Sequence, residues 1–321
     1  MLNSSVWQNI SHDKILHAVE EVLQEKLSNL LLARNSYINR VYEIEKYASQ
    51  ERFIIKLYRP GRWTKEMILE EHKFLEELAK KENPVIPPLK IKKQTIFEFK
   101  PGPIFFALFP KKRGRALDEF EQEGWKEIGR ILARIHLTGE KHKSSQRIEW
   151  RPLVATKHHM GILLKSDFLL KDFQEAFKKT ADLFIKKAEP LFAGKKFILL
   201  HGDCHKGNFI HRPGEGIFLV DFDDACFGPA IQDMWMLLPD IPEKCEREIN
   251  WLRSGYEIFR AFDREQLSLI PLLRGMRMIH FAAWLAIQSQ EPDFSKHFPE
   301  AGKARYWNEL IRELQELVLN C

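Results

Sequence analysis

The stretch from Leu199 to Leu238 constrains this chain more than any other. An apolar run enters a polar turn over 201–208, which reads HGDCHKGN, and the residues from Phe209 to Arg212 then form a candidate strand. The following residues, 213–216, read PGEG, a strong turn signal, so 217–220 becomes the returning strand of a hairpin. If that turn is regular, Arg212 lies opposite Ile217, and the same register places Asn208 opposite Asp221.

This register brings oxygen-bearing side chains together at one end of the hairpin. Cross-strand partners lie about 4.5–5.5 Å apart at Cβ, so the Asn208 amide and the Asp221 carboxylate are expected to share one cation. Hard oxygen ligands suit Mg²⁺, which proteins hold with one or two side chains plus substrate phosphates. Asp203 lies five residues before Asn208, on the loop that enters the same end of the hairpin.

A carboxylate beside a metal-binding pair is the arrangement that phosphoryl transfer requires, with the carboxylate orienting the acceptor hydroxyl. The spacing His-x-Asp-x-x-x-x-Asn, followed by an Asp after a short hairpin, resembles the aminoglycoside phosphotransferase and choline kinase-like group. These enzymes are relatives of the eukaryotic protein kinases. The alternative is a polar loop and a surface hairpin whose acidic residues are only solvated.

The composition is that of a soluble globular protein. The 321 residues include 44% hydrophobic and 30% charged residues, and the formal net charge of +5 does not call for a nucleic-acid or membrane partner. The four cysteines form no CxxC pair, and the first residues lack the basic and apolar regions of a signal peptide. The apolar segment 278–287 is too short to span a bilayer. We therefore expect a reduced, cytoplasmic and monomeric protein.

The first part of the chain supplies a candidate for the other half of an ATP site. Residues 40–44 and 53–58 alternate like an antiparallel pair of strands, and Lys56 interrupts the second one. Lysine in a strand is usually on an edge or a solvent face; here we interpret it as a contact to ATP phosphates. Thr64 is a candidate N-cap for a helix over 65–78, and Glu71 falls in the middle of its apolar stripe. A buried charge needs a partner, so we predict a pair between Lys56 and Glu71, with Glu70 as the second choice.

A change of composition near residue 110 divides the chain. Strand-like segments end there and helical patterns dominate afterwards, which predicts an N-terminal nucleotide-binding lobe over 1–110 and a C-terminal catalytic and substrate lobe over 111–321. The expected fold class is α+β, a bilobal protein kinase-like fold with an antiparallel sheet in the first lobe and mainly helices in the second. The resemblance places the backbone of Phe109 to Lys111 at the adenine of ATP.

Several later residues have two interpretations each. His136 follows the apolar stripe of a helix and is interpreted as a structural histidine rather than a catalytic one. Arg274 and Arg277 share a helix face and either meet an acidic or phosphorylated substrate or form structural ion pairs, which we favour. The resemblance to these kinases implies that Asp233 anchors the catalytic loop from the start of the next helix. Asp223 and Asp224 either approach the metal or serve the structure.

Segments from both lobes resemble the bacterial stress response kinase A family. The matching segments are 35–42 (NSYINRVY), 56–64 (KLYRPGRWT), 68–72 (ILEEH), 221–225 (DFDDA) and 228–238 (GPAIQDMWMLL). The resemblance implies an ATP- and Mg²⁺-dependent serine/threonine protein kinase that phosphorylates itself and acts in stress survival. It also implies that Asp203 and Asp221 are catalytic, with Asp203 as the proton acceptor, that Asn208 and Asp221 bind Mg²⁺, and that Ser36 lies at the phosphates. The loop 35–39 contains no glycine, in contrast to most kinases.

Three other functions match parts of this sequence. A small-molecule kinase for an amino alcohol, sugar or antibiotic would use the same base and metal. A metallophosphoesterase would match Gly202-Asp203-Cys204-His205 superficially, but the chain lacks the upstream Asp-x-His that such enzymes need. A pseudokinase usually lacks one of four polar groups that are all present here: Lys56, Asp203, Asn208 and Asp221.

Overall fold

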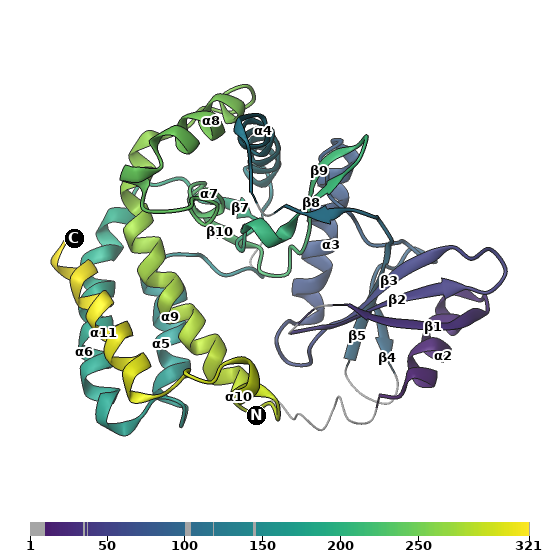
Figure 1. Ribbon diagram of the computed structural model, residues 1–321, viewed down its shortest axis with the longest axis horizontal. Helices are drawn as coiled ribbons and strands as arrows, with labels where there is room; N and C mark the ends of the chain where they lie inside the picture. The colour runs from purple at the N-terminus through teal and green to yellow at the C-terminus, as the bar shows by residue number, and fades with distance from the viewer. Residues whose placement is uncertain are drawn as a thin grey trace.

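Two lobes make up the molecule, as the sequence predicts (Figure 1). The computed structural model describes residues 10–34, 36, 38–99, 104–117, 119–143 and 146–320. The smaller lobe is built around an antiparallel sheet, and the larger one is mainly helical, so the bilobal kinase-like fold is confirmed.

A five-stranded antiparallel sheet forms the smaller lobe, in the order β1-β2-β3-β5-β4. The strands are β1 (Leu27–Arg34), β2 (Arg40–Lys46), β3 (Arg52–Leu57), β4 (Phe97–Phe99) and β5 (Ile104–Pro110). Lys56 lies on the central strand β3, between Val41 of β2 and Ala107 of β5. Its side chain is buried because it stands on a face of the sheet where it meets Asp221, Asp223 and the Tyr58 ring.

Two helices pack against this sheet. Helix α2 (His12–Leu23) buries Ile15 and Val19 in a small core with the strands. Helix α3 (Lys65–Lys80) begins at Thr64, whose side chain accepts a hydrogen bond from the Met67 amide at 3.3 Å, so the predicted N-cap is confirmed. Its buried face includes Phe74, Leu75 and Leu78, which belong to the core of the larger lobe. Helix α3 therefore joins the two lobes.

Helices dominate the larger lobe, and most of their buried side chains form one continuous core. They are α4 (Gln122–Gly139), α5 (Lys157–Leu164), α6 (Lys171–Ala188), α7 (Gln232–Trp235), α8 (Glu246–Tyr256), α9 (Ile270–Gln288), α10 (Phe294–His297) and α11 (Ala304–Leu319). Two small sheets carry the loops between them: β7 (Ile198–Leu200) pairs with β10 (Cys226–Gly228), and β8 (Phe209–Arg212) lies between β6 (Arg115–Ala116) and β9 (Gly216–Leu219).

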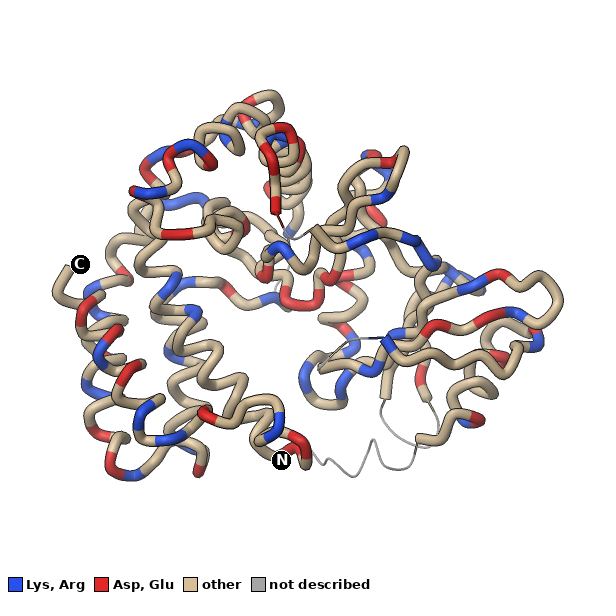
Figure 2. Tube along the Cα trace, viewed as in Figure 1, with Lys and Arg blue, Asp and Glu red and all other residues tan. Residues whose placement is uncertain are grey.

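One segment of the described chain, Arg264–Gln288, is long and apolar enough to cross a membrane, and it contains α9. It is longer than the apolar segment recognised in the sequence. Just over half of its most apolar window is buried inside the protein, because α9 packs against α5 and α11. These properties are typical of a core helix. On the outer helices α6 and α11, basic and acidic residues are interspersed (Figure 2).

Candidate functional site

The loop between β7 and β8, which carries the candidate base Asp203, is held by Asp233, at the start of the short helix α7. The fully buried Asp233 carboxylate accepts hydrogen bonds from the backbone N–H groups of His201 and Gly202, each at 2.8 Å. Gly202 has a φ of 85°, and a Cβ there would lie 2.1 Å from the Asp224 carbonyl oxygen, so only glycine fits. The prediction that Asp233 anchors this loop is confirmed.

Asp203 projects from this loop, and both of its carboxylate oxygens have a side-chain partner. Arg277 of α9 donates to Oδ1 at 2.6 Å, and Nε2 of His205 lies 3.6 Å from Oδ2. Burial raises the pKa of Asp203, but His205 and Arg277 outweigh that effect and hold this pKa well below its usual range. The candidate base is therefore ionised at neutral pH. Arg277 forms an ion pair, as favoured from the sequence, but its partner is the candidate base.

The hairpin register differs by one residue from the prediction. Arg212 pairs with Gly216, so Asn208 lies opposite Val220, whose N–H donates to the Asn208 carbonyl at 3.0 Å. The loop has three residues rather than four, because the turn closes with a hydrogen bond from Glu215 N–H to Arg212 and Gly214 adopts a φ of 79°. Asp221 comes one residue after the paired position, with a φ of 67°.

Lys56 and the two aspartates after β9 form the centre of the site. The Lys56 ammonium contacts Asp221 at 2.9 Å and also Asp223, and only 11% of the Lys56 side chain is exposed. Burial lowers the pKa of Lys56, but Asp221, Asp223 and Glu71 together raise it well above its usual value. The lysine is therefore charged in the site.

Glu71 faces the same cavity but does not have the predicted direct ion pair with Lys56 among the described contacts. Its nearest cationic partner is Arg147, at 3.8 Å, and the side chain is buried. Burial and the charge of Asp223 raise the pKa of Glu71. Glu71 does not pair with Lys56 because the Lys56 ammonium already forms ion pairs with Asp221 and Asp223. The second choice, Glu70, is also buried, and it lies 3.4 Å from His142.

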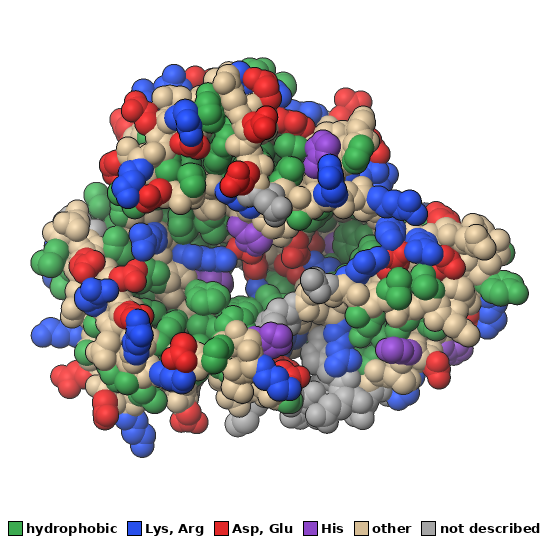
Figure 3. All heavy atoms as spheres, in the orientation of Figure 1, with side chains coloured by type: hydrophobic (Ala, Val, Ile, Leu, Met, Phe, Trp, Pro, Cys, Tyr) green, Lys and Arg blue, Asp and Glu red, His purple; other side chains and the backbone are tan. Residues whose placement is uncertain are grey.

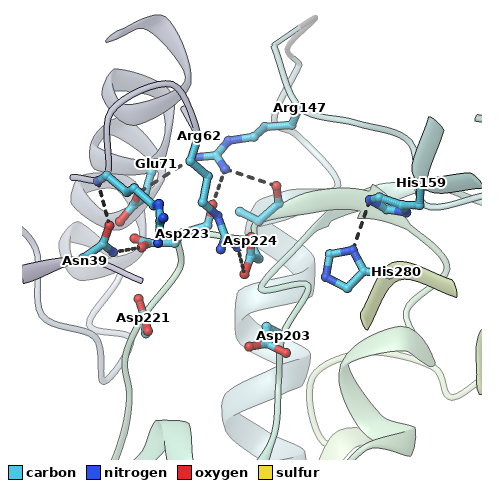
Figure 4. A network of polar contacts seen from close by, with 12 residues as sticks. Asn39, Arg62, Glu71, Arg147, His159, Asp203, Asp221, Asp223, Asp224 and His280 are labelled. Atoms are coloured by element: carbon cyan, nitrogen blue, oxygen red, sulfur yellow. Dashed lines mark hydrogen bonds and ion pairs between the residues drawn. The ribbon is translucent and has the colours of Figure 1, made fainter. Parts of the chain in front are cut away.

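Asn39 was missed in the sequence because its partner lies 184 residues away. Its amide donates to Asp223 at 2.6 Å, and its oxygen accepts from the Arg59 N–H at 3.1 Å. Asp224 is held by Arg62 through both carboxylate oxygens, at 2.7 and 2.9 Å. These contacts tie the smaller lobe to the segment after β9, and Figure 4 shows the side chains converging there.

The residues present fit a divalent cation. The amide nitrogen of Asn208 donates a hydrogen bond to the Asp203 carbonyl at 2.9 Å, so the amide oxygen of Asn208 can act as a metal ligand. Just over half of the Asp221 side chain is exposed. Among the described residues, no group of three His, Cys, Asp or Glu side chains could hold an ion unaided. The donor set suits a metal that gains its remaining ligands from phosphates and water.

A cavity of about 460 Å³ between the lobes collects most of the predicted residues. Lys56, Glu71, Asp203 and Asp221 line it, and so do Ser36 and Phe109. Of the residues next to Ser36, Asn35 and Tyr37 lie outside the described part of the chain. The Lys111 side chain pairs with Glu43 instead, so any contact of Lys111 with a nucleotide would involve its backbone and stays a prediction.

His136 is a structural residue, as interpreted from the sequence. It is fully buried, and its ring contacts the Tyr256 hydroxyl at 2.8 Å and the Asp233 carboxylate at 3.3 Å. It thereby supports the anchor of the catalytic loop.

Three other histidines, His72 and His159 (buried) and His280 (half-buried), should make the fold sensitive to acid. Burial lowers the pKa of His72 to about 3, of His159 to about 2 and of His280 to about 4. Below about pH 6.5 the unfolded chain binds protons that the folded one excludes, so stability is complete above that pH and decreases as the pH falls. From pH 7 to pH 5, each histidine should lower the free energy of unfolding by up to about 2 kcal/mol.

Urea denaturation at pH 7, 6 and 5 measures this effect. His72→Gln should reduce the pH dependence, whereas His17→Gln, at a largely exposed position on α2, should not. An unchanged pH dependence in His72→Gln would contradict the assignment of this effect to His72.

Known proteins share both the sequence pattern and the fold. The description "Phosphotransferase enzyme family" applies to residues 30–269 of this chain. Stress response kinase A of Escherichia coli (strain K12) is 34% identical over 96% of this chain and 92% of the relative. The chain belongs to the phosphotransferase enzyme family, in its stress response kinase A branch. It is therefore a kinase.

A further relative and two solved structures are also kinases by name. A protein named serine/threonine protein kinase RdoA, from Salmonella typhimurium, is 33% identical over 95% of this chain and 92% of its own length. Among solved structures, amicoumacin kinase hAmiN in complex with AMP-PNP, Ca²⁺ and Ami has a TM-score of 0.78 at 18% identity, covering 99% of this chain and 96% of that one. Choline kinase LicA from Streptococcus pneumoniae has a TM-score of 0.64 at 16% identity, over 97% and 100%. These two structures support the fold alone.

Proposed function

We propose that this stress response kinase A homologue is an ATP- and Mg²⁺-dependent protein kinase. It would phosphorylate serine or threonine residues of protein substrates and of itself, in the cytoplasm of a stressed bacterium. The observation that carries the proposal is one cavity lined by Lys56, Asp221 and Asp203, in a chain whose full-length relatives include a named serine/threonine protein kinase. We expect a monomer without nucleic-acid or membrane partners.

The side chains have separate tasks in this proposal. Asp203 accepts the proton of the acceptor hydroxyl, and its ionised state prepares it for that task. Lys56 moves from Asp221 to the phosphate oxygens, and Ser36 lies at the same phosphates. Asn208 and Asp221 would hold Mg²⁺, which supplies charge stabilisation at the transferring phosphoryl group.

A kinase for a small molecule is the second candidate. The solved structures with this fold include kinases named for amicoumacin and choline, and their folds extend over nearly the whole chain. In favour of a polypeptide acceptor, the relative named serine/threonine protein kinase is 33% identical, whereas these solved neighbours are 16–18% identical. The space-filling view shows the molecule hollowed between its lobes, where either kind of acceptor would enter (Figure 3).

Incubation with labelled ATP separates the two candidates. We expect label in the protein itself and in a generic protein substrate, a complete loss with EDTA, and recovery when Mg²⁺ is added. An Asp203→Asn preparation controls for contaminating kinases. Label that enters a small amino alcohol or sugar but neither protein would overturn the proposed substrate class.

A further inference from the structure

A second cavity, of about 350 Å³, adjoins the candidate ATP site on the side of α9. It shares Asp223, Asp224 and Trp284 with the first cavity. Arg59, at its edge, contacts Gln288 at 2.6 Å and also pairs with Glu291, so the loop after β3 is tied to the end of α9. The cavity thus lies between the lobes, next to the loop that carries Asp203.

The polar lining of this second cavity is mainly basic. It includes four arginines, of which Arg277 pairs with the candidate base Asp203 and Arg62 pairs with Asp224. Its two carboxylates are already engaged: Asp223 binds Lys56 and Asn39, and Asp224 binds Arg62. Within the described lining, a cationic acceptor would therefore find no carboxylate without a partner.

Two histidines of this lining, His159 and His280, can donate hydrogen bonds but carry no negative charge. His280 lies on α9, one turn after Arg277, and its Nδ1 is 3.0 Å from Nε2 of His159 (Figure 4). Burial first, and then the charge of Arg277, lowers the pKa of His280 to about 4, so both rings are neutral at neutral pH. They add no charge to the four arginines, each of which has a carboxylate partner: Glu291 for Arg59, Asp224 for Arg62, Glu71 for Arg147 and Asp203 for Arg277.

Arg277 differs from the other arginines because its partner is the reacting base. An acceptor hydroxyl has to approach the Asp203 carboxylate, which Arg277 now binds at 2.6 Å. About a quarter of the Arg277 side chain is exposed, so it can turn toward a ligand. Its planar guanidinium fits a carboxylate or phosphate through two parallel hydrogen bonds. An anion near the acceptor hydroxyl would replace the contact that Arg277 gives up.

We propose that Arg277 selects acceptors that carry an anionic group beside the hydroxyl. This inference rests on the proposed protein-kinase function. The preferred substrate would then be a serine or threonine in an acidic segment. One charge-assisted contact should favour such an acceptor by about 10- to 100-fold in kcat/KM.

Matched peptides test this selection. Three peptides of equal length carry one serine flanked by Glu, Gln or Lys, and kcat/KM is measured with Mg²⁺ and ATP. The Glu peptide should be the best acceptor, and the ratio of Glu to Gln should fall toward one in Arg277→Gln but be partly kept in Arg277→Lys. Arg274→Gln is the control, since Arg274 lies one turn away and pairs with Glu313 at 3.2 Å; its ratio should match the wild type.

Other results would overturn the inference. If Gln or Lys peptides equal the Glu peptide, or if Arg277→Gln slows all three peptides equally, Arg277 only positions Asp203. A parallel assay compares a small hydroxy acid with an amino alcohol of the same size. If no peptide is phosphorylated but the hydroxy acid is preferred in an Arg277-dependent way, the protein-kinase proposal fails and the anion selection stands.

Discussion

Replacing Asp203 by alanine should lower the rate of phosphoryl transfer by about 10²–10⁴-fold, the usual contribution of a general base. Asp203 lines the cavity shared with Lys56 and Asp221, and Arg277 and His205 keep it ionised. The effect should appear in kcat, because the carboxylate acts on the acceptor proton and not on ATP binding. Single-turnover transfer of labelled phosphate measures it.

Asp203→Asn is the matched variant for this experiment. The asparagine keeps the shape of the side chain and can still accept the hydrogen bond of Arg277, but it cannot take up a proton. It should be as slow as Asp203→Ala, whereas Asp182→Ala, on the exposed face of α6, should keep the wild-type rate. A rate within a few-fold of wild type in Asp203→Asn would exclude Asp203 as the proton acceptor.

Local patterns in the sequence predicted much of the site. The spacing of Asp203, Asn208 and Asp221 predicted the loop and the hairpin that bring Asp203 and Asp221 to one cavity, and the apolar stripe of α3 placed Glu71 at the same cavity, which Lys56 also lines. These predictions succeeded because each depends on residues close in sequence. The one-residue error in the hairpin arose because Pro213-Gly214-Glu215-Gly216 allows two loop lengths, and only the backbone shows which one forms.

Contacts between distant segments could not be predicted in the same way. Asn39 and Asp223 are 184 residues apart, and Arg277 lies 74 residues after Asp203. The face shared by Arg274 and Arg277 was visible as helical spacing, but that spacing does not show which arginine meets the base. Lys56 was expected to have one carboxylate partner, and it has two others because the turn at Asp221 brings Asp221 and Asp223 beside it.

Asp233→Ala should both destabilise the fold and reduce activity. It leaves the buried N–H groups of His201 and Gly202 without an acceptor, and each such group costs about 1–3 kcal/mol. The sum, about 2–6 kcal/mol, is a large part of the stability of a typical domain. The released loop also carries Asp203, so the base loses its position. Urea denaturation and labelled-phosphate transfer measure the two effects.

Comparison with Asp203→Ala separates anchoring from chemistry. Loss of the base should slow transfer, and loss of its ion pair with Arg277 should also lower the urea midpoint, but by less than loss of the anchor, which leaves two buried N–H groups without an acceptor. Asp233→Asn keeps one oxygen acceptor and should fall between Asp233→Ala and the wild type, and the exposed Asp182→Ala should change the free energy of unfolding by about 0.5 kcal/mol or less. If Asp233→Ala unfolds at the same urea concentration as Asp182→Ala, the two 2.8 Å hydrogen bonds do not hold the loop, and the position of Asp203 must depend on Arg277 and His205.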